Sequence, residues 1–190
     1  MNPLHNFQHM IAVLGLVTAT TGLLAACAAP TAVSTPSTLW HEKNSGAYNT
    51  DTGRVFYGIG IAEPLKSRSL QRVTADNRAR REIAGVIDQY CKALAVTATR
   101  TGGGAVQSLP ADQLLASLNL LVRQVMQRAI VVDHWVDPHS KRMKALCALE
   151  LTQFQAVLAQ QTAMHPRLQS SMQHYAEMVY DQLSGNFHDN

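Results

Sequence analysis

Val55-Phe-Tyr-Gly-Ile-Gly-Ile-Ala62 is the stretch that decides the fold of this 190-residue chain. Its β-branched and aromatic residues predict a strand that ends before Pro64. Alternation divides the strand into two faces, one with Val55, Tyr57, Ile59 and Ile61 and the other with Phe56, Gly58, Gly60 and Ala62. Because glycines on one face let another backbone approach closely, we expect a helix to pack there. The Gly-x-Gly pair lacks the third glycine and the acidic partner of a dinucleotide-binding loop.

A long helix is predicted after this strand, beginning at Ser67 or Ser69, either of which can cap it, and ending near Ala98. Apolar residues recur along it at steps of three and four, which predicts one buried stripe. The stripe consists of Val73, Ala79, Ile83, Val86, Ile87, Tyr90 and Leu94, with Cys91 at its edge.

The beginning of this helix is basic. From Lys66 to Arg81 there are six positive residues, and Asp76 is the one acidic residue. Positive charge near a helix N-terminus opposes the macrodipole and costs about 0.3 kcal/mol or more per exposed charge. The cluster is therefore a candidate patch for a phosphate-bearing lipid or an acidic protein surface, with a solvated helix face as the alternative. The candidate residues are Arg72, Arg78, Arg80 and Arg81.

Further elements are predicted downstream of the triple-glycine loop at residues 102–104, which lacks the Gly-Lys-Ser/Thr of a phosphate cradle. The first is a helix that begins at Pro110. A hairpin follows, with strands over 130–136 and 142–151 joined by the turn 137–140. The last two elements are a helix over 153–164, which ends near Pro166, and an amphipathic helix from about Leu168 to Gly185. In the hairpin, Trp135 is either a core residue or a stacking surface for a planar ligand.

Together these elements predict an α+β fold, a three-stranded antiparallel sheet with the long helix packed across one face, in the order β-α-α-β-β-α. We expect this domain to cover residues 55–164, and a C-terminal amphipathic helix and tail to cover residues 165–190. Three strands and one long helix leave sheet edges and one sheet face that the other helices or neighbouring copies must cover.

The N-terminal segment has the pattern of a bacterial lipoprotein. Leu24-Ala25-Ala26-Cys27 closes an uncharged apolar run that begins near Met10. The small residues suit a signal peptidase, and the thiol of Cys27 would receive the lipid. The alternative, an uncleaved membrane anchor, needs a longer apolar run that threonines do not interrupt. Met1 to Met10 holds no Lys or Arg, so the usual positive n-region is weak.

We therefore expect residues 1–26 to be a signal peptide and residues 27–54 to be the lipidated cysteine and a flexible tether. The tether is expected because residues 28 to about 50 are rich in Pro, Ser, Thr, Ala and Asn and show no apolar period. Trp40 is the exception in this segment, either an interfacial contact or an incidental residue.

Composition indicates an ordered domain. Hydrophobic residues make up 46% of the chain, and 16 Lys and Arg against 13 Asp and Glu give a net charge of +3. Export and the lack of a compact Arg/Lys-aromatic motif argue against nucleic acid as a partner. Cys91 and Cys147 would enter an oxidising compartment, where they are either two buried thiols or a disulfide that joins a helix to a strand.

The sequence offers little support for catalysis. The eight histidines show no metal-ligand spacing, so neither a metal nor another cofactor is expected. Asp133, His134 and Asp137 near Ser140 could form a hydrolytic set, but there is no nucleophile elbow and Asp-Pro-His-Ser is ordinary turn chemistry. We therefore do not expect an enzyme.

Four ordered segments resemble a known family. They are Tyr57-Gly-Ile-Gly60, Ala75-Asp-Asn-Arg-Ala-Arg-Arg-Glu-Ile-Ala84, Val132-Asp-His-Trp-Val-Asp-Pro138 and Ala145-Leu-Cys-Ala-Leu-Glu-Leu151. Their order and spacing, together with the lipobox, are similar to the LPP-twenty family of small outer-membrane lipoproteins, which includes FlgP-like flagellar lipoproteins that build discs or rings around the motor. The resemblance covers about residues 55–160. It implies a small antiparallel sheet covered by a long helix, and no catalytic residues.

Two functions are expected. The first is a non-enzymatic lipoprotein on the periplasmic side of the outer membrane, a structural or assembly component that self-associates, with the flagellum as one candidate location. Ala28, rather than an acidic residue, follows Cys27, as in the outer-membrane sorting pattern. The second is a binding module that holds a lipid, a glycan or a protein partner at the sheet face around Trp135 or at the arginine-rich helix start.

Overall fold

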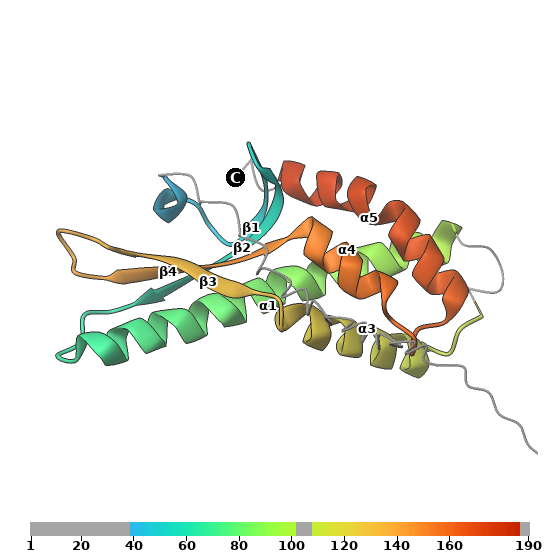
Figure 1. Ribbon diagram of the computed structural model, residues 1–190, viewed down its shortest axis with the longest axis horizontal. Coiled ribbons are helices and arrows are strands. Elements are labelled where there is room, and N and C mark those ends of the chain that lie inside the picture. The colour runs from blue at the N-terminus through green and yellow to red at the C-terminus, as the bar shows by residue number, and fades with distance from the viewer. Residues whose placement is uncertain (1–38, 102–107, 187–190) are drawn as a thin grey trace, which may run out of the picture. The chain divides into compact units, whose positions relative to one another are not determined.

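Figure 1 shows the computed structural model, which describes residues 39–101 and 108–186. The described elements belong to one compact unit. The expected signal peptide, the lipidation site Cys27, the triple-glycine loop and the C-terminal tail lie outside the described residues. In chain order the elements are η1 (Trp40–Glu42), β1 (Gly46–Thr50), β2 (Gly53–Ala62), α1 (Arg68–Thr101), α3 (Ala111–Met126), β3 (Ile130–Val136), β4 (Met143–Glu150), α4 (Leu151–Ala159) and α5 (Pro166–Asn186).

The fold is α+β, as predicted, but its antiparallel sheet has four strands in the order β1-β2-β4-β3. The additional strand is β1, which corrects both the predicted strand number and the predicted extent of the flexible tether. It forms a tight hairpin with β2 in which Thr50 pairs with Gly53. Gly53 has φ 140°, a conformation that favours glycine. The Thr50 hydroxyl donates to the carbonyl of Gly53 over 2.8 Å and closes the turn.

The long helix α1 runs along one face of the sheet, as the glycines of β2 predict (Figure 1). A Cβ added at Gly58 would lie less than 3.0 Å from the backbone of Ala79 and Ile83, and one at Gly60 would meet Ala75 and Ala79 equally closely. The two backbones are therefore in direct contact, which no other residue type allows without moving the helix.

The first turn of α1 begins as predicted. The hydroxyl of Ser67 accepts a hydrogen bond from the N–H of Leu70 over 3.3 Å, the usual arrangement of an N-cap. The prediction of the buried stripe is wrong for one residue, because the side chain of Val73 is 53% exposed. The buried positions at this end of the helix are Gln71, Ala75 and Ala79.

The predictions for the second half of the chain hold with shifted boundaries. The helix after Pro110 and the 130–151 hairpin are present. The third helix is shorter than predicted and occupies Leu151–Ala159. Pro166 does not only stop that helix but begins α5, since proline suits the first turn of a helix. Helix α5 continues through Gly185, where termination was predicted.

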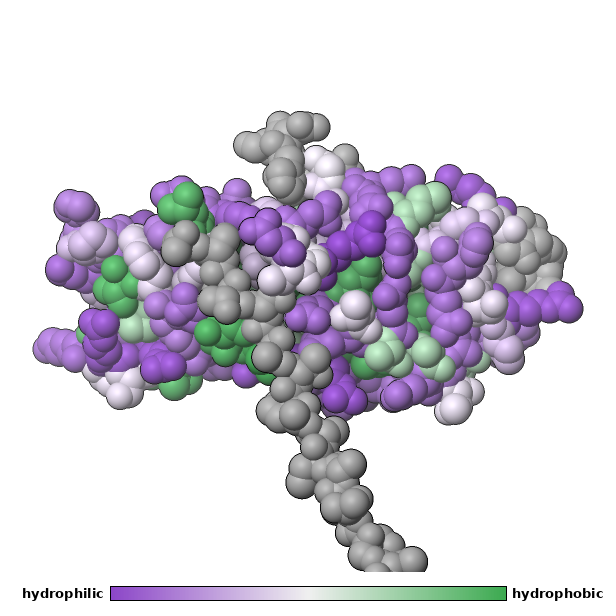
Figure 2. Space-filling view, turned by 45° about the horizontal axis from the view of Figure 1, so that its top comes forward, coloured by the Kyte–Doolittle hydropathy of each residue, from purple (hydrophilic) through white to green (hydrophobic). Residues whose placement is uncertain are grey.

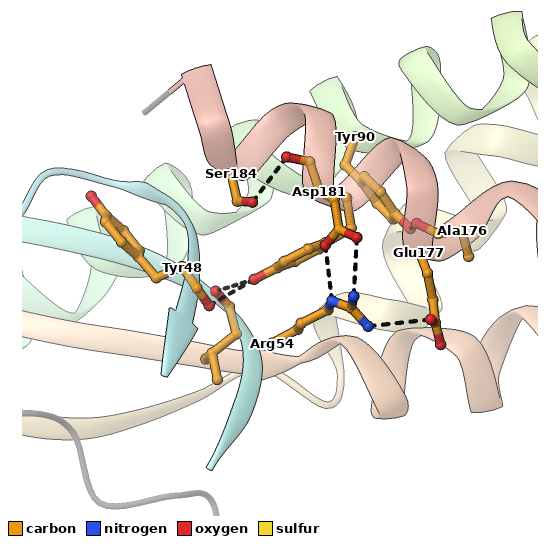
Figure 3. Close-up of polar contacts among 9 residues, drawn as sticks. Tyr48, Arg54, Tyr90, Ala176, Glu177, Asp181 and Ser184 are labelled. Carbon is orange, nitrogen blue, oxygen red and sulfur yellow. Dashed lines mark hydrogen bonds and ion pairs between the residues drawn. The ribbon is translucent and has the colours of Figure 1, made fainter. Parts of the chain in front are cut away.

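Helix α5 is fastened to both α1 and the β1–β2 hairpin, as Figure 3 shows. The hydroxyl of Tyr180 donates to the carbonyls of Tyr48 and Val55, each over 2.9 Å, and the hydroxyl of Tyr90 donates to the carbonyl of Ala176 over 2.7 Å. The rings of Tyr90 and Tyr180 pack against Phe56 with centroid distances of 5.0 Å, so the hydrogen bonds lie around an aromatic core.

An exposed ion pair adds to the fastening of α5. The guanidinium of Arg54 on β2 forms two hydrogen bonds of 3.0 Å with the carboxylate of Asp181 and one of 3.2 Å with Glu177 (Figure 3). The C-terminal helix is therefore part of the same packed unit as the sheet.

Candidate interaction surfaces

One half of the sheet has three strands and two open edges. Strand β1 pairs with β2 only from Gly53 to Tyr57, so from Gly58 to Ala62 strand β2 pairs with β4 alone. On the other side β3 pairs only with β4 among the described residues. We call residues 58–62 the β2 edge and residues 130–136 the β3 edge. Open edges of this kind are templates for pairing with another strand.

A groove with a volume of about 330 Å³ runs between the β2 edge and α1. Arg78, Arg81 and Glu82 line it on the helix side. Two backbone groups of the edge already have side-chain partners, because Arg78 donates to the carbonyl of Ile61 and the hydroxyl of Ser45 accepts from the N–H of Ile59 over 2.9 Å. Ile61 itself is 39% exposed. Side chains therefore bond two backbone groups of the β2 edge, but among the described residues no second strand pairs with it.

The β3 edge contains a bulge, since the pairing with β4 shifts between Val131 and Asp133. It begins with Ile130, whose side chain is 44% exposed. Its charged residues bond within the domain: Nε2 of His134 lies 2.5 Å from a carboxylate oxygen of Asp76 on α1. This contact ties the edge strand to the helix.

The predicted arginine patch does not form one surface. Arg78 and Arg80 are two residues apart, which places them about 200° apart around a helix. Arg78 reaches the β2 edge, whereas Arg80 reaches the opposite side and donates to the carbonyl of Ala129 over 3.2 Å. Arg81 lines the groove beside Arg78, and Arg72 is exposed at the helix start. Two of the four arginines therefore hold α1 to the backbone of the sheet region.

The sheet face opposite α1 is closed by the chain's own N-terminal segment. Trp40, expected to be an incidental or interfacial residue, is only 3% exposed, and its indole N–H donates to the carboxylate of Asp133 over 2.7 Å. The ring of His41 stacks on Trp135 with a centroid distance of 4.4 Å and an interplanar angle of 11°. Of the two alternatives considered for Trp135, a stacking surface open to a planar ligand is not available, because His41 occupies that position.

Cys91 and Cys147 are free and buried, so the disulfide considered between them is not formed. Cys147 pairs with Gly58, which lies against Ala79 and Ile83, whereas Cys91 lies about 12 Å further along the helix axis than Ile83 at 1.5 Å per residue. That exceeds the Cα separation of a disulfide. Burial raises the pKa of both thiols, that of Cys147 to about 11, so both stay protonated and unreactive at neutral pH.

The suggested hydrolytic set is not assembled. Asp137 accepts hydrogen bonds from the Ser140 hydroxyl over 2.7 Å and from the N–H of His139 over 2.8 Å, and these bonds lower its pKa. His134 bonds instead to Asp76 on α1. Within residues 39–101 and 108–186, no three His, Cys, Asp or Glu side chains are grouped as metal ligands. No helix in the same ranges is both long and apolar enough to cross a bilayer.

Comparison with known proteins adds no assignment. No protein-family model matches the chain, and a search of curated proteins gives no significant match. The resemblance to the LPP-twenty family therefore stays a prediction. The two sheet edges and the basic start of α1 are the surfaces on which a function can be argued.

Proposed function

We propose that this protein is a non-enzymatic lipoprotein on the periplasmic side of the outer membrane, a structural or assembly component of the cell envelope that associates with further copies of itself. The observation that supports this best is the three-stranded half of the sheet, in which the β2 edge and the β3 edge are both open among the described residues. Pairing of one copy's β2 edge with the next copy's β3 edge is a heterologous contact, which generates rings or filaments. A flagellar location would follow from the resemblance to the LPP-twenty family.

Both edges carry features that limit indiscriminate pairing with other strands. Charged side chains and bulges are the means by which folded proteins limit edge-to-edge pairing. Arg78 on the β2 edge and the shift after Val131 on the β3 edge are of these two kinds. Each edge also exposes one large aliphatic side chain, Ile61 or Ile130, that a neighbouring copy can bury.

The test is the molar mass in solution of residues 32–190, measured by light scattering over a range of concentrations. We expect a discrete oligomer. The variants Ile61→Lys and Ile130→Lys, which place a charge at an exposed position on each edge, should each shift the protein toward the monomer. Leu115→Lys on α3, where the side chain is 54% exposed, is the matched control and should keep the oligomer.

Two results would contradict self-association through the edges. One is a monomer at every concentration. The other is an oligomer that both edge variants and the control leave unchanged, which would move the contact to another surface.

The lipid anchor is tested separately on the full chain in a Gram-negative host. We expect Cys27 to carry a lipid that mass spectrometry detects on the mature N-terminus, and Cys27→Ser to abolish it together with outer-membrane fractionation. Unchanged mass and fractionation of the variant would end this part of the proposal.

The alternative of a binding module has support at only one of its two places. His41 already occupies the stacking position on Trp135. At the second place, the basic side chains at the start of α1 remain largely exposed.

A further inference from the structure

The segment before β1 bonds to both open edges of the sheet. We call residues 40–45 the N-terminal strap, which lies on the sheet face opposite α1. At its end, the hydroxyl of Ser45 accepts a hydrogen bond from the N–H of Ile59 on the β2 edge over 2.9 Å. At its beginning, the indole N–H of Trp40 donates to the carboxylate of Asp133 on the β3 edge over 2.7 Å. One short segment therefore reaches from one edge of the sheet to the other.

Contacts with the middle of the sheet hold the strap in this position. Lys144 on β4 donates to the carbonyl of His41 over 2.5 Å. The ring of His41 stacks on Trp135, and the side chain of Trp40 is buried. The two ends of the strap are therefore presented to the edges by a segment that is itself fixed to the sheet.

The bond to Ser45 occupies a backbone donor that faces the open side of β2. In an antiparallel ladder, successive residues direct their N–H and C=O groups alternately to the two neighbouring strands. Because Ser45 directly precedes β1, the N–H of Ile59 points to the side on which β1 pairs with β2. From Gly58 onward no strand among the described residues pairs on that side. A strand of a second copy that pairs there needs this N–H.

The same alternation can be followed across the sheet to the β3 edge. Ile59 faces away from β4, so its partner Leu146 faces β3, and Asp133, the partner of Leu146, faces β4. The next residue, His134, therefore directs its N–H to the open side of β3. This N–H donates to the carboxylate of Asp133 over 2.7 Å. A second edge donor is thus occupied by a side chain.

The carboxylate of Asp133 connects this second donor to the strap. One of its oxygens accepts the N–H of His134 and the other accepts the indole N–H of Trp40. Since Trp40 is buried, its bond fixes the orientation in which the carboxylate occupies the edge donor. Both edges therefore have a backbone N–H whose availability depends on the strap.

We propose that the N-terminal strap restrains edge-to-edge association between copies of this protein. An incoming strand has to displace the hydroxyl of Ser45 at one edge and the carboxylate of Asp133 at the other before it gains the backbone bonds behind them. Each contact then offsets about one hydrogen bond of the pairing. Both contacts act on one interface, because the β2 edge of one copy meets the β3 edge of the next. The inference rests on the proposed self-association and names its regulation.

Hydrogen bonds between strands matter here because apolar contact is limited. The face of the molecule in Figure 2 is mainly hydrophilic, with small separate hydrophobic spots. Ile61 and Ile130 are the exposed aliphatic side chains that the two edges offer. An association without a large apolar patch depends on strand pairing, so a side chain that occupies an edge donor has a measurable effect.

The experiment compares the dissociation constant between copies of residues 32–190 in the unchanged chain and in two variants, by light scattering over a range of concentrations. Ser45→Ala frees the N–H of Ile59. Trp40→Phe keeps a buried aromatic ring and removes the donor that orients Asp133. We expect each variant to associate about fivefold more tightly, the factor that corresponds to one ordinary hydrogen bond, and the double variant about twenty-five-fold.

Two control variants remove the same kinds of group away from the edges. Ser117→Ala removes a hydroxyl that bonds within α3, and Tyr175→Phe removes a phenol hydroxyl on α5. Both should associate within about twofold of the unchanged chain. Amide exchange in a dilute, monomeric sample gives a second readout. Exchange at Ile59 should become faster in Ser45→Ala alone, and exchange at His134 in Trp40→Phe alone.

Three results would overturn the proposal, each with a different meaning. Equal association of the unchanged chain and both variants, all oligomeric, would leave self-association standing without control by the strap. Weaker association of Ser45→Ala would make the strap part of the contact between copies. Monomers at every concentration, in the unchanged chain and in all variants, would overturn the proposed self-association and this inference with it.

Discussion

The indole N–H of Trp40 donates to the carboxylate of Asp133 over 2.7 Å and so joins the N-terminal end of the described chain to the β3 edge. The two residues are 93 positions apart in sequence, and Trp40 is 3% exposed. Lys144 adds a second tie by donating to the carbonyl of His41 over 2.5 Å. The described segment before β1 is therefore a structural layer on the sheet face opposite α1, and Trp40 belongs to the folded domain.

Removing this layer should destabilise the domain strongly. We expect Trp40→Ala to lower the free energy of unfolding by about 3 to 5 kcal/mol, because a buried aromatic side chain is lost and Asp133 keeps only its bond from the N–H of His134. Urea denaturation of residues 32–190 measures this. Leu39→Ala, at a position 57% exposed, is the control and should change stability by less than about 0.5 kcal/mol. A cost below about 1 kcal/mol for Trp40→Ala would show that the segment is only loosely attached.

The contact between the backbones of β2 and α1 leads to a second prediction, on the stability of glycine variants. Gly58→Ala should cost about 3 kcal/mol or more, because its Cβ would overlap Ala79 and Ile83 and the helix must move. Gly85→Ala on the same helix is a matched control, since its Cβ meets nothing within 4 Å, and it should stabilise the protein by about 1 kcal/mol. Thermal unfolding of both variants tests the pair. Similar effects of both substitutions would contradict the close contact at Gly58.

The two attachments of α5 should differ in strength. Tyr180→Phe removes a buried hydroxyl whose single hydrogen is shared between two strand carbonyls, and we expect a loss of about 1 to 3 kcal/mol in the free energy of unfolding. Arg54→Gln removes an ion pair whose side chains are 36% to 62% exposed, so we expect at most about 1 kcal/mol. Chemical denaturation gives both values. The reverse order would mean that the ion pair, not the tyrosine, fastens α5.

Stability should fall at alkaline pH. Burial raises the pKa of the Cys91 and Cys147 thiols above the ordinary 9.0, and that of the Tyr90 and Tyr180 phenols above the ordinary 10.0. Above these ordinary values the unfolded chain loses protons that the folded chain retains, so stability decreases as pH rises and is full below about pH 9.

The expected slope is about 1.4 kcal/mol per pH unit for each group that has ionised only in the unfolded chain. Urea midpoints measured between about pH 7 and pH 11 check it. Tyr180→Phe should reduce the slope above about pH 10, because one of the four groups is gone. A flat stability profile up to about pH 11 would argue against the burial of these groups.

The parts of the fold with regular patterns were predictable from the sequence. The alternation of Val55 to Ala62 predicted β2 and both its faces, and its glycines indicated the helix contact correctly. Strand β1 was missed because Gly46–Thr50 is short, lies in a polar segment and is stabilised mainly by pairing with β2. No local pattern relates Trp40 to Asp133, since the contact exists only after the sheet has formed.

The candidate sites were predictable only in part. Counting charges placed Arg78, Arg80 and Arg81 in one patch, although the helical rotation of 100° per residue already separates Arg78 from Arg80. The periodicity also assigned Val73 to the buried stripe, but Val73 lies about 160° around the helix from the buried Gln71 and Ala75 and is exposed. The open edges depend on the length of β1, which the sequence did not predict.

Amide hydrogen exchange at low and high protein concentration tests the central claim most directly, because it reads the two edges themselves. If copies pair edge to edge, exchange in residues 58–62 and 130–136 slows as the concentration rises, while exchange on the exposed side of α3 stays the same. Edge amides that exchange at the same rate at every concentration, in a sample that light scattering shows to be oligomeric, would contradict pairing through the edges.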